Sequence, residues 1–126
     1  MKKILYTILI ILIIFFSILI YSRFIGTIGL KTNEIPYNTK SISPSYDGLK
    51  IVHFSDIHYK KVITEERVKQ LIKEINKINP DIVIFTGDLL DKNYKLTNKD
   101  INFLIKQLSK INSKYGNFAI IGDNDY

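Results

Sequence analysis

Acidic residues and a histidine gather in three clusters between residues 55 and 125 of this 126-residue chain. The clusters read Ser-Asp-Ile-His at residues 55–58, Thr-Gly-Asp-Leu-Leu-Asp at 86–91 and Gly-Asp-Asn-Asp at 122–125. Carboxylates that converge on one place disfavour one another's charge unless a cation lies between them. Mixed oxygen and imidazole ligands suit Mn, Fe or Zn better than Ca. If the clusters meet in space, they predict a divalent metal site.

Each cluster directly follows a short apolar run, at residues 51–54, 82–85 and 118–121. Runs of this length, nearly continuous and rich in Ile and Val, are typical of parallel strands that are covered on both faces. The sequence therefore predicts three strands. Ligands of an open parallel sheet bind outside the carboxyl ends of its strands, where all three clusters would lie.

Two segments with apolar residues at helical spacing separate the three runs. Their expected core stripes are Val68, Leu71, Ile72, Ile75 and Ile78, and then Ile101, Leu104, Ile105, Leu108 and Ile111. Thr64 is the expected N-cap of the first helix, with Glu65 and Glu66 in its first turn. Thr97 and Asp100 predict a capping box at the start of the second.

The order strand-helix-strand-helix-strand predicts an α/β fold, a partial βαβαβ layered unit with right-handed crossovers. Three strands and two helices make a thin structure. Such a sheet buries one face under its helices and leaves the other with little cover. We therefore expect residues 50–126 to be the first part of a larger layered domain.

The three clusters, in this order, resemble the first sequence blocks of the calcineurin-like metallophosphoesterases. The matching residues are Asp56-x-His58, Gly87-Asp88-x-x-Asp91 and Gly122-Asp123-Asn124-Asp125. The sequences around the first two blocks, at residues 50–58 and 80–88, look like the bacterial membrane-anchored branch of that family. The resemblance covers Lys50 to Tyr126, the N-terminal half or so of the family's catalytic domain.

The resemblance implies two divalent metal ions, Mn, Fe or Zn, and hydrolysis of phosphate mono- or diesters. Asp56 and His58 would bind the first ion and Asp88 would bridge both. Asp123 would bind the second ion through oxygen. Asp91 and Asp125 would contact the ligands rather than the metal.

Two departures from the family pattern predict an impaired enzyme. Asn124 stands where the family has the histidine that is thought to serve as general acid, and an amide cannot protonate a leaving alkoxide. Loss of a positioned acid typically costs ~10²–10⁴-fold in rate. The family's later blocks, which supply further histidine ligands, are absent from the chain. We expect an incomplete metal site, weak metal affinity and little or no activity, with no certain catalytic residue.

Outside the acidic clusters, His53 and the pair Lys60-Lys61 are also candidates for chemistry. His53 lies within the first predicted strand, and we expect a hydrogen-bonded core or near-site histidine rather than a ligand. The lysine pair could neutralise a phosphate, although a solvated loop pair is the more common case.

The N-terminus carries an apolar run without charge from residue 4 to residue 22. As a helix it would be about 28 Å long, close to the hydrocarbon thickness of a bilayer. Residues 1–22 therefore predict a transmembrane anchor. A cleaved signal peptide is the competing interpretation, but the run is long and lacks an Ala-x-Ala-like site.

Lys2 and Lys3 precede the span and only Arg23 follows it closely. The positive-inside rule then predicts a single-pass protein of the cell membrane with a cytoplasmic N-terminus and an extracytoplasmic domain. Residues 23–49 contain Gly, Pro, Ser and Thr without a sustained period, which predicts a linker, with a short strand around Asn33–Tyr37.

The net charge of +6 lies mainly on the anchor and its tether. Residues 1–50 hold six Lys/Arg and two Asp/Glu, which favours contact with anionic lipid. The sequence contains no basic stripe with interleaved aromatic residues, so it does not indicate a nucleic-acid partner. The absence of cysteine decides nothing about compartment.

Two functions remain open from the sequence. The first is a membrane-tethered phosphoesterase that acts on a phosphate-ester substrate of the envelope or a lipid-like molecule. The second is a non-catalytic membrane-tethered remnant or partner-binding module, in which a second chain could supply the missing C-terminal half. An interrupted reading frame is a third explanation of the chain's length.

Overall fold

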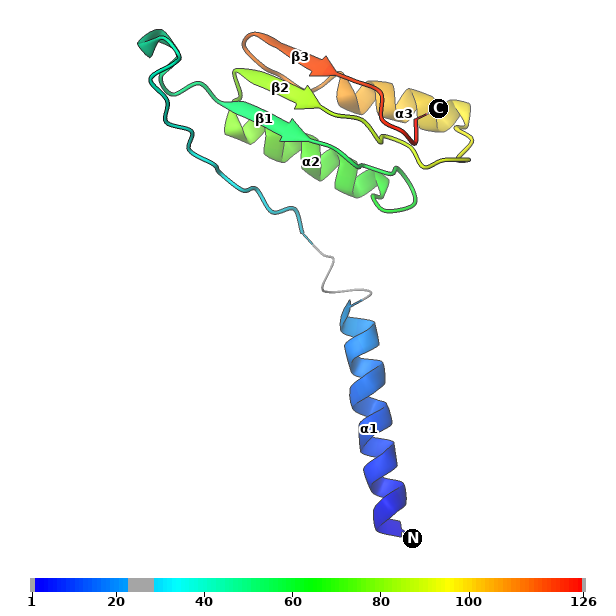
Figure 1. Cartoon of the computed structure of the whole chain (residues 1–126). Coiled ribbons are helices and arrows are strands. Elements are labelled where there is room, and N and C mark those ends of the chain that lie inside the picture. Colours follow the sequence, from blue (N-terminus) through cyan, green and yellow to red (C-terminus); the bar gives the residue numbers. More distant parts are fainter. Residues whose placement is uncertain (1, 23–28, 126) are drawn as a thin grey trace. The chain divides into compact units, whose positions relative to one another are not determined.

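The computed structural model describes residues 2–22 and 29–125, which divide into two compact units, Met1–Ile35 and Pro36–Tyr126 (Figure 1). The first unit contains helix α1 (Lys2–Ile20), whose described side chains are all exposed. This helix is long and apolar enough to cross a membrane. The expected anchor helix is thus present. Its membrane orientation, and the exact domain limits of 1–22, 23–49 and 50–126, stay predictions.

The linker contains no β-strand among its described residues 29–49. The strand expected at Asn33–Tyr37 is therefore wrong, because no other segment pairs with this extended stretch. Part of the expected linker, residues 23–28, lies outside the described residues. A single turn of 3-10 helix, η2 (Pro44–Tyr46), follows Ser43, whose hydroxyl accepts a hydrogen bond from the Ser45 amide at 3.4 Å.

A three-stranded parallel sheet forms the centre of the second unit, in the order β1-β2-β3 (Figure 1). Its strands are β1 (Ile51–Phe54), β2 (Ile82–Phe85) and β3 (Gly116–Ala119). Helices α2 (Glu65–Ile78) and α3 (Asn98–Leu108) connect them. The predicted βαβαβ unit is confirmed.

The third strand begins two residues earlier than predicted and ends two residues earlier. The parallel register sets Gly116 opposite Ile82 and Ala119 opposite Phe85. The Tyr115 amide already donates to the carbonyl of Asp81 at 2.8 Å. Backbone pairing with β2, rather than the apolar run at residues 118–121, therefore determines the bounds of β3.

Both connecting helices begin at the caps that the sequence indicates. The Thr64 hydroxyl accepts from the Arg67 amide at the start of α2, and α3 carries the full capping box of Thr97 and Asp100. Helix α2 ends at Asn79 in the left-handed conformation, just before Pro80. These caps satisfy backbone donors and acceptors that the helices themselves leave free.

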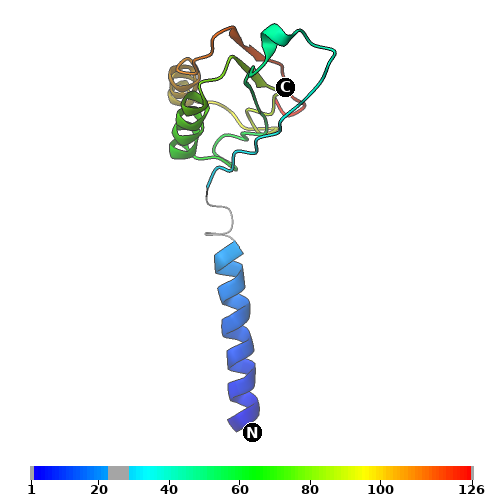
Figure 2. The same ribbon diagram turned by 90° about the vertical axis from the view of Figure 1, so that its left-hand side faces the viewer.

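Both helices cover the same face of the sheet, as Figure 2 shows. The core cluster between them contains Ile57, Tyr59, Val68, Ile72 and Leu104. The stripe predicted on α2 is confirmed at its buried positions. That on α3 is partly wrong, because Ile105 is 63% exposed and Asp100 and Gln107 are buried beside Leu104. Ile111 lies beyond the end of α3.

The opposite face of the sheet is exposed in the described residues. Ile51 of β1 and Phe118 of β3 are each more than half exposed, and so is Ile120 after β3. The interpretation of the strands as covered on both faces is therefore wrong for this chain. The expectation of a thin unit with one sparsely covered face is confirmed.

Candidate metal centre

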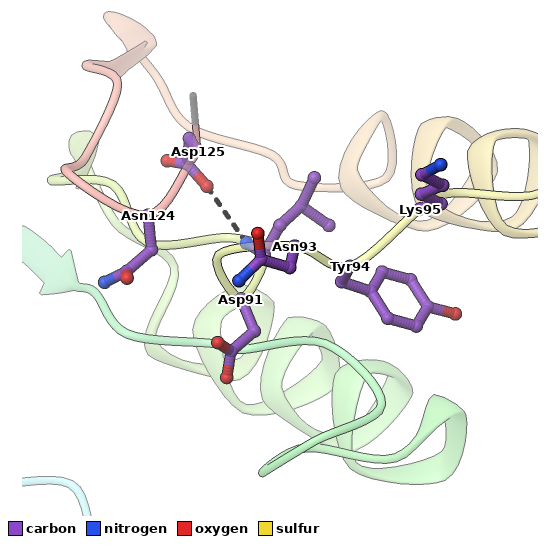
Figure 3. A pocket seen from close by; sticks show the side chains of 7 residues that line it. Asp91, Asn93, Tyr94, Lys95, Asn124 and Asp125 are labelled. Carbon is purple, nitrogen blue, oxygen red and sulfur yellow. Dashed lines mark hydrogen bonds between the residues drawn. The ribbon is translucent and has the colours of Figure 1, made fainter.

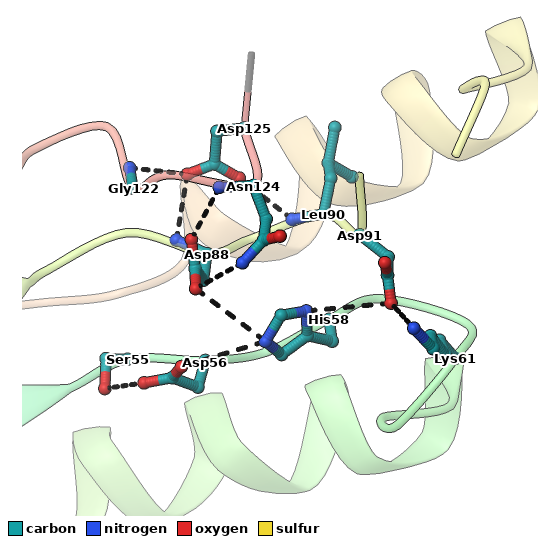
Figure 4. Close-up of polar contacts among 10 residues, drawn as sticks. All are labelled: Ser55, Asp56, His58, Lys61, Asp88, Leu90, Asp91, Gly122, Asn124 and Asp125. Atoms are coloured by element: carbon teal, nitrogen blue, oxygen red, sulfur yellow. Dashed lines mark hydrogen bonds and ion pairs between the residues drawn. The ribbon is translucent and has the colours of Figure 1, made fainter. Parts of the chain in front are cut away.

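The loop after β1 alternates between the core and the surface. Ile57 and Tyr59 are fully buried, whereas Asp56 and His58 point to the outer side of the sheet edge (Figure 4). The two apolar side chains anchor the loop in the core cluster. This alternation brings the carboxylate and the imidazole to the same side of the loop.

Backbone pairing continues past the ends of the strands and aligns this loop with the loop after β2. The amide of Asp56 donates to the carbonyl of Gly87 at 3.1 Å, and that of His58 donates to the carbonyl of Asp88 at 3.0 Å. The acidic clusters of the first two strand ends therefore lie side by side, as their shared sheet edge predicts.

Asp56, His58 and Asp88 all have left-handed backbone conformations, with φ of 56°, 39° and 59°. Residues other than glycine seldom adopt this region, although Asp, Asn and His do so more readily than most. Such conformations persist only where the surrounding structure fixes them, and they concentrate at functional sites. The sequence gives no sign of this feature.

The side chains of these three residues converge on one point. Nε2 of His58 lies 3.7 Å from Oδ1 of Asp56 and 3.8 Å from Oδ2 of Asp88. One ligand atom from each residue lies within 4.8 Å of the other two. These separations are longer than the donor–acceptor distance of a hydrogen bond. They fit two ligands that bind the same ion at an angle, each about 2.0–2.2 Å from it.

The other ring nitrogen of His58 supports the same interpretation. Its Nδ1 is buried without a hydrogen-bond partner, and the nearest carboxylate oxygen, Oδ2 of Asp91, lies 3.9 Å away. Metal-bound histidines usually direct their second nitrogen at a carboxylate or carbonyl, which fixes the ring. Asp91 is itself ion-paired with Lys61 (Figure 4). The supporting role of Asp91 behind a metal ligand stays a prediction.

Asp125 joins the loops after β2 and β3. Its Oδ2 accepts from the amides of Asp88 and Gly122, and its Oδ1 accepts from the amide of Leu90, all at 2.9 Å (Figure 4). The carboxylate thereby fixes the backbone that carries Asp88. Its role as a support of metal ligands stays a prediction.

Asn124 holds the side chain of Asp88. Its backbone amide donates to Oδ1 at 3.0 Å and its side-chain amide donates to Oδ2 at 2.8 Å. These hydrogen bonds, first that of the backbone and then that of the side chain, lower the pKa of the Asp88 carboxyl below its ordinary value. Asp88 is therefore held ionised, the state that a metal ligand requires.

Two glycines allow these loops to approach each other. Gly87 has a φ of +94°, and a Cβ there would collide with the backbone of Gly122. A Cβ on Gly122 would in turn collide with the amide nitrogen and the carboxylate of Asp88. Any larger residue at Gly122 would therefore displace Asp88.

The sequence of the chain also matches a known protein family. The sequence profile of the family described as calcineurin-like phosphoesterase matches residues 49–126. The chain belongs to the calcineurin-like phosphoesterase family. The match includes all three acidic clusters and the whole sheet, and it confirms the resemblance that the three clusters indicate.

Similar proteins of this family include the uncharacterized metallophosphoesterase YkuE of Bacillus subtilis, 34% identical over 84% of this chain and 36% of the relative. The UDP-2,3-diacylglucosamine pyrophosphatase LpxG of Chlamydia muridarum is 32% identical over 77% of this chain and 29% of the relative. A transmembrane protein with metallophosphoesterase domain from Danio rerio is 27% identical over 74% of this chain and 20% of the relative.

The chain thus spans about a third or less of the length of these relatives. No solved structure matches it. Its apolar helix α1 and membrane-associated relatives suggest a membrane anchor for this member of the family.

Asp123 is the predicted ligand that the structure does not bring into the group of Asp56, His58 and Asp88. It is exposed at the tip of the last turn, so its assignment to a second ion stays a prediction. His53 lies outside this group, and its Nε2 lies 2.8 Å from the Thr86 hydroxyl. It is exposed, so the expectation of a core position is wrong for it.

Beside the centre lies a hollow of about 280 Å³ whose lining includes Asp91 and Asn124 (Figure 3). The other lining residues are Leu90, Asn93, Tyr94, Lys95 and Asp125. No pattern in the sequence singles out Asn93 or Lys95, because loop residues of these types are common on any surface. Sequence reasoning also assigned Asp100 only a helix cap and gave Lys61 no structural partner.

Proposed function

We propose that this chain carries the first ligands of a binuclear metal centre that hydrolyses phosphate esters at a membrane. The observation that carries the proposal is the convergence of Asp56, His58 and Asp88 at the carboxyl ends of neighbouring parallel strands. The family is one of metal-dependent hydrolases of phosphoesters, and the match of residues 49–126 supports the same chemistry here.

In this proposal Asp56 and His58 bind the first ion, Asp88 bridges two ions and Asp123 binds the second. Mn, Fe or Zn suits the mixture of oxygen and imidazole ligands. When bound, such a pair supplies an activated water and neutralises charge on the phosphoryl oxygens. The chain's own part is to hold Asp88 ionised through Asn124 and to orient His58 against Asp91.

We propose that this chain is a poor catalyst. Asn124, at the family's general-acid position, donates its side-chain amide to the Asp88 carboxylate and offers no proton for a leaving group. Esters with acidic leaving groups need no such proton, so they should react faster than alkyl esters. Three clustered protein ligands also predict weak metal affinity, since catalytic metals usually have at least three ligands each.

The proposed substrate is a phosphate ester or anhydride held close to the bilayer. Helix α1 would tether the domain there, with the N-terminus cytoplasmic and the domain on the other side of the membrane. The relative LpxG, which is named as a pyrophosphatase of a diacylated sugar nucleotide, supports a lipid-like substrate.

A second candidate is a non-catalytic tethered module, and the exposed apolar face of the sheet favours it. Ile51, Phe118 and Ile120 lie on or beside this face and are each more than half exposed. Large exposed apolar patches on soluble proteins commonly bind another surface. Nothing in the described residues identifies a second chain as the partner.

Hydrolysis of bis(p-nitrophenyl) phosphate by the full chain in detergent micelles, with and without Mn²⁺, tests the proposal. The matched variants are Asp88→Asn and Asp47→Asn, which make the same change in charge inside and outside the metal-site loops. Mn²⁺-dependent hydrolysis that Asp88→Asn abolishes and Asp47→Asn preserves supports the enzyme. Equal rates in all three proteins would end the catalytic claim and leave the tethered module.

Calorimetric titration of the same proteins with Mn²⁺ separates metal binding from turnover. The proposal predicts weak binding that Asp88→Asn removes. Tight binding of two ions per chain would overturn the prediction of an incomplete site.

A further inference from the structure

Asp100, in the first turn of α3, is a fully buried carboxylate that the metal chemistry described above does not use. Among residues 2–22 and 29–125, Asp100 and Gln107 are the buried polar side chains. A buried carboxylate is costly unless it is paired and hydrogen-bonded. Its partners therefore show what holds it in place.

One oxygen of Asp100 serves the helix cap. Oδ2 accepts from the Thr97 amide at 3.0 Å, from the Thr97 hydroxyl at 2.6 Å and from the Tyr94 hydroxyl at 3.2 Å. All three donors lie between β2 and the start of α3. The capping box itself requires only the contact with the Thr97 amide, together with the bond from the Asp100 amide to the Thr97 hydroxyl.

The other oxygen, Oδ1, faces the loop after β1. It is ion-paired and hydrogen-bonded to Nζ of Lys60, and it accepts from the Tyr59 hydroxyl at 3.3 Å. Tyr59 and Lys60 directly follow His58. Half of the carboxylate thus holds the segment that carries a metal ligand, a role that α3 itself does not require.

Other contacts also hold this segment, among them the backbone bonds of the His58 amide to Asp88 and of the Lys60 amide to Ile63. Tyr59 stacks on Phe103 with ring centroids 5.8 Å apart, and its amide donates to the carbonyl of Leu89. His58 and Lys60 on either side have left-handed backbones, with φ of 39° and 65°. A backbone in this region relaxes when its anchors are lost. His58 would then move away from Asp56 and Asp88.

We infer that Asp100 is a positioning residue, which holds Tyr59 and Lys60 and thereby fixes Nε2 of His58 opposite Asp56 and Asp88. This inference rests on the proposed function, because it assigns Asp100 a role in metal affinity without contact with the metal. A residue that only stabilised α3 would affect unfolding and leave affinity unchanged. The two oxygens of Asp100 allow these roles to be separated.

Two substitutions of its partners make the separation. Lys60→Met removes the ion pair on Oδ1 and leaves the capping box, whereas Thr97→Ala removes the cap on Oδ2 and leaves the loop contacts. By Coulomb's law alone, loss of a lysine near the site should strengthen the binding of a cation. A weaker binding in Lys60→Met therefore cannot be an effect of charge. Lys60→Arg restores the donor and the charge.

The experiment measures Mn²⁺ binding to the full chain in micelles by electron paramagnetic resonance, together with urea unfolding. We expect Lys60→Met to weaken affinity ~10-fold, as loss of outer contacts to metal ligands typically does. Thr97→Ala should lower the urea midpoint and change affinity by less than ~2-fold, and Lys60→Arg should stay within ~3-fold of wild type. If Lys60→Met does not fold, Tyr59→Phe replaces it, with an expected loss of ~3-fold.

Unchanged or stronger binding in Lys60→Met, or an equal loss in Thr97→Ala, would overturn the inference. Amide hydrogen exchange at His58 and Tyr59 supplies a readout that needs no metal. If wild type binds no Mn²⁺, the proposed function fails. Exchange that is still faster in Lys60→Met than in Thr97→Ala then upholds the positioning of the loop, and equal exchange in the two variants refutes it.

Discussion

Asp125→Asn should loosen the metal-site loops, because this carboxylate accepts three backbone hydrogen bonds. The Asp88 and Gly122 amides share Oδ2, and the Leu90 amide bonds Oδ1. An asparagine keeps one acceptor, which can serve the shared pair. Its NH₂ group would then face the Leu90 amide, a donor against a donor.

The size of the effect follows from that count. Hydrogen bonds to a charged group contribute ~1.5–3 kcal/mol each, and a buried donor left without a partner costs ~1–3 kcal/mol. With the shared pair retained in weaker form, we expect a loss of about 2–3 kcal/mol. At ~1.4 kcal/mol for each factor of ten, amide exchange at Leu90 should accelerate about 30- to 150-fold.

Nuclear magnetic resonance of the full chain in micelles, with EDTA present, measures this exchange. Asp123→Asn is the matched control, since it makes the same change in charge two residues away on an exposed side chain. We expect it to alter exchange at Leu90 by less than ~3-fold, as for a surface substitution. Equal acceleration in both variants would refute the role of the three hydrogen bonds to Asp125, because the effect would then come from charge alone.

Three further predictions follow from the described contacts. Gly122→Ala should displace Asp88, since the new Cβ collides with its amide and carboxylate, and should weaken Mn²⁺ binding more than ~10-fold in a calorimetric titration. Ile72→Ala, at a core position 4% exposed, should lower the free energy of unfolding by ~2–5 kcal/mol in urea, against less than ~1 kcal/mol for Ile105→Ala, at 63% exposed. Lys60, and then Thr97, lower the pKa of Asp100, so the folded state gains stability above the ordinary carboxyl pKa of ~3.9 and loses it as the pH falls further. The urea midpoints of wild type and Asp100→Asn should therefore differ at pH 7 and converge toward pH 2.

The sequence predicts the order of elements because strand, helix and cap signals agree with one another. Thr64 and Thr97 cap the two helices as their types indicate. The convergence of Asp56, His58 and Asp88 was predictable because parallel strands present their carboxyl ends at one edge.

Other features were beyond the sequence because they depend on register and on distant partners. The start of β3 follows from backbone pairing with Asp81 and Ile82, not from the position of its apolar residues. The burial of Asp100 depends on Lys60, forty residues away. Asp56 and His58 have left-handed backbones although neither is a glycine, the residue type that would predict this conformation.

The identity of the imidazole at the metal tests the central claim most directly. The chain has only two histidines, so electron spin echo modulation of the Mn²⁺-loaded chain has few possible nitrogen sources. We predict modulation from one bound imidazole that disappears in His58→Gln and persists in His53→Gln. Absence of the signal in wild type, or its loss in His53→Gln instead, would contradict the metal centre proposed at the ends of β1 and β2.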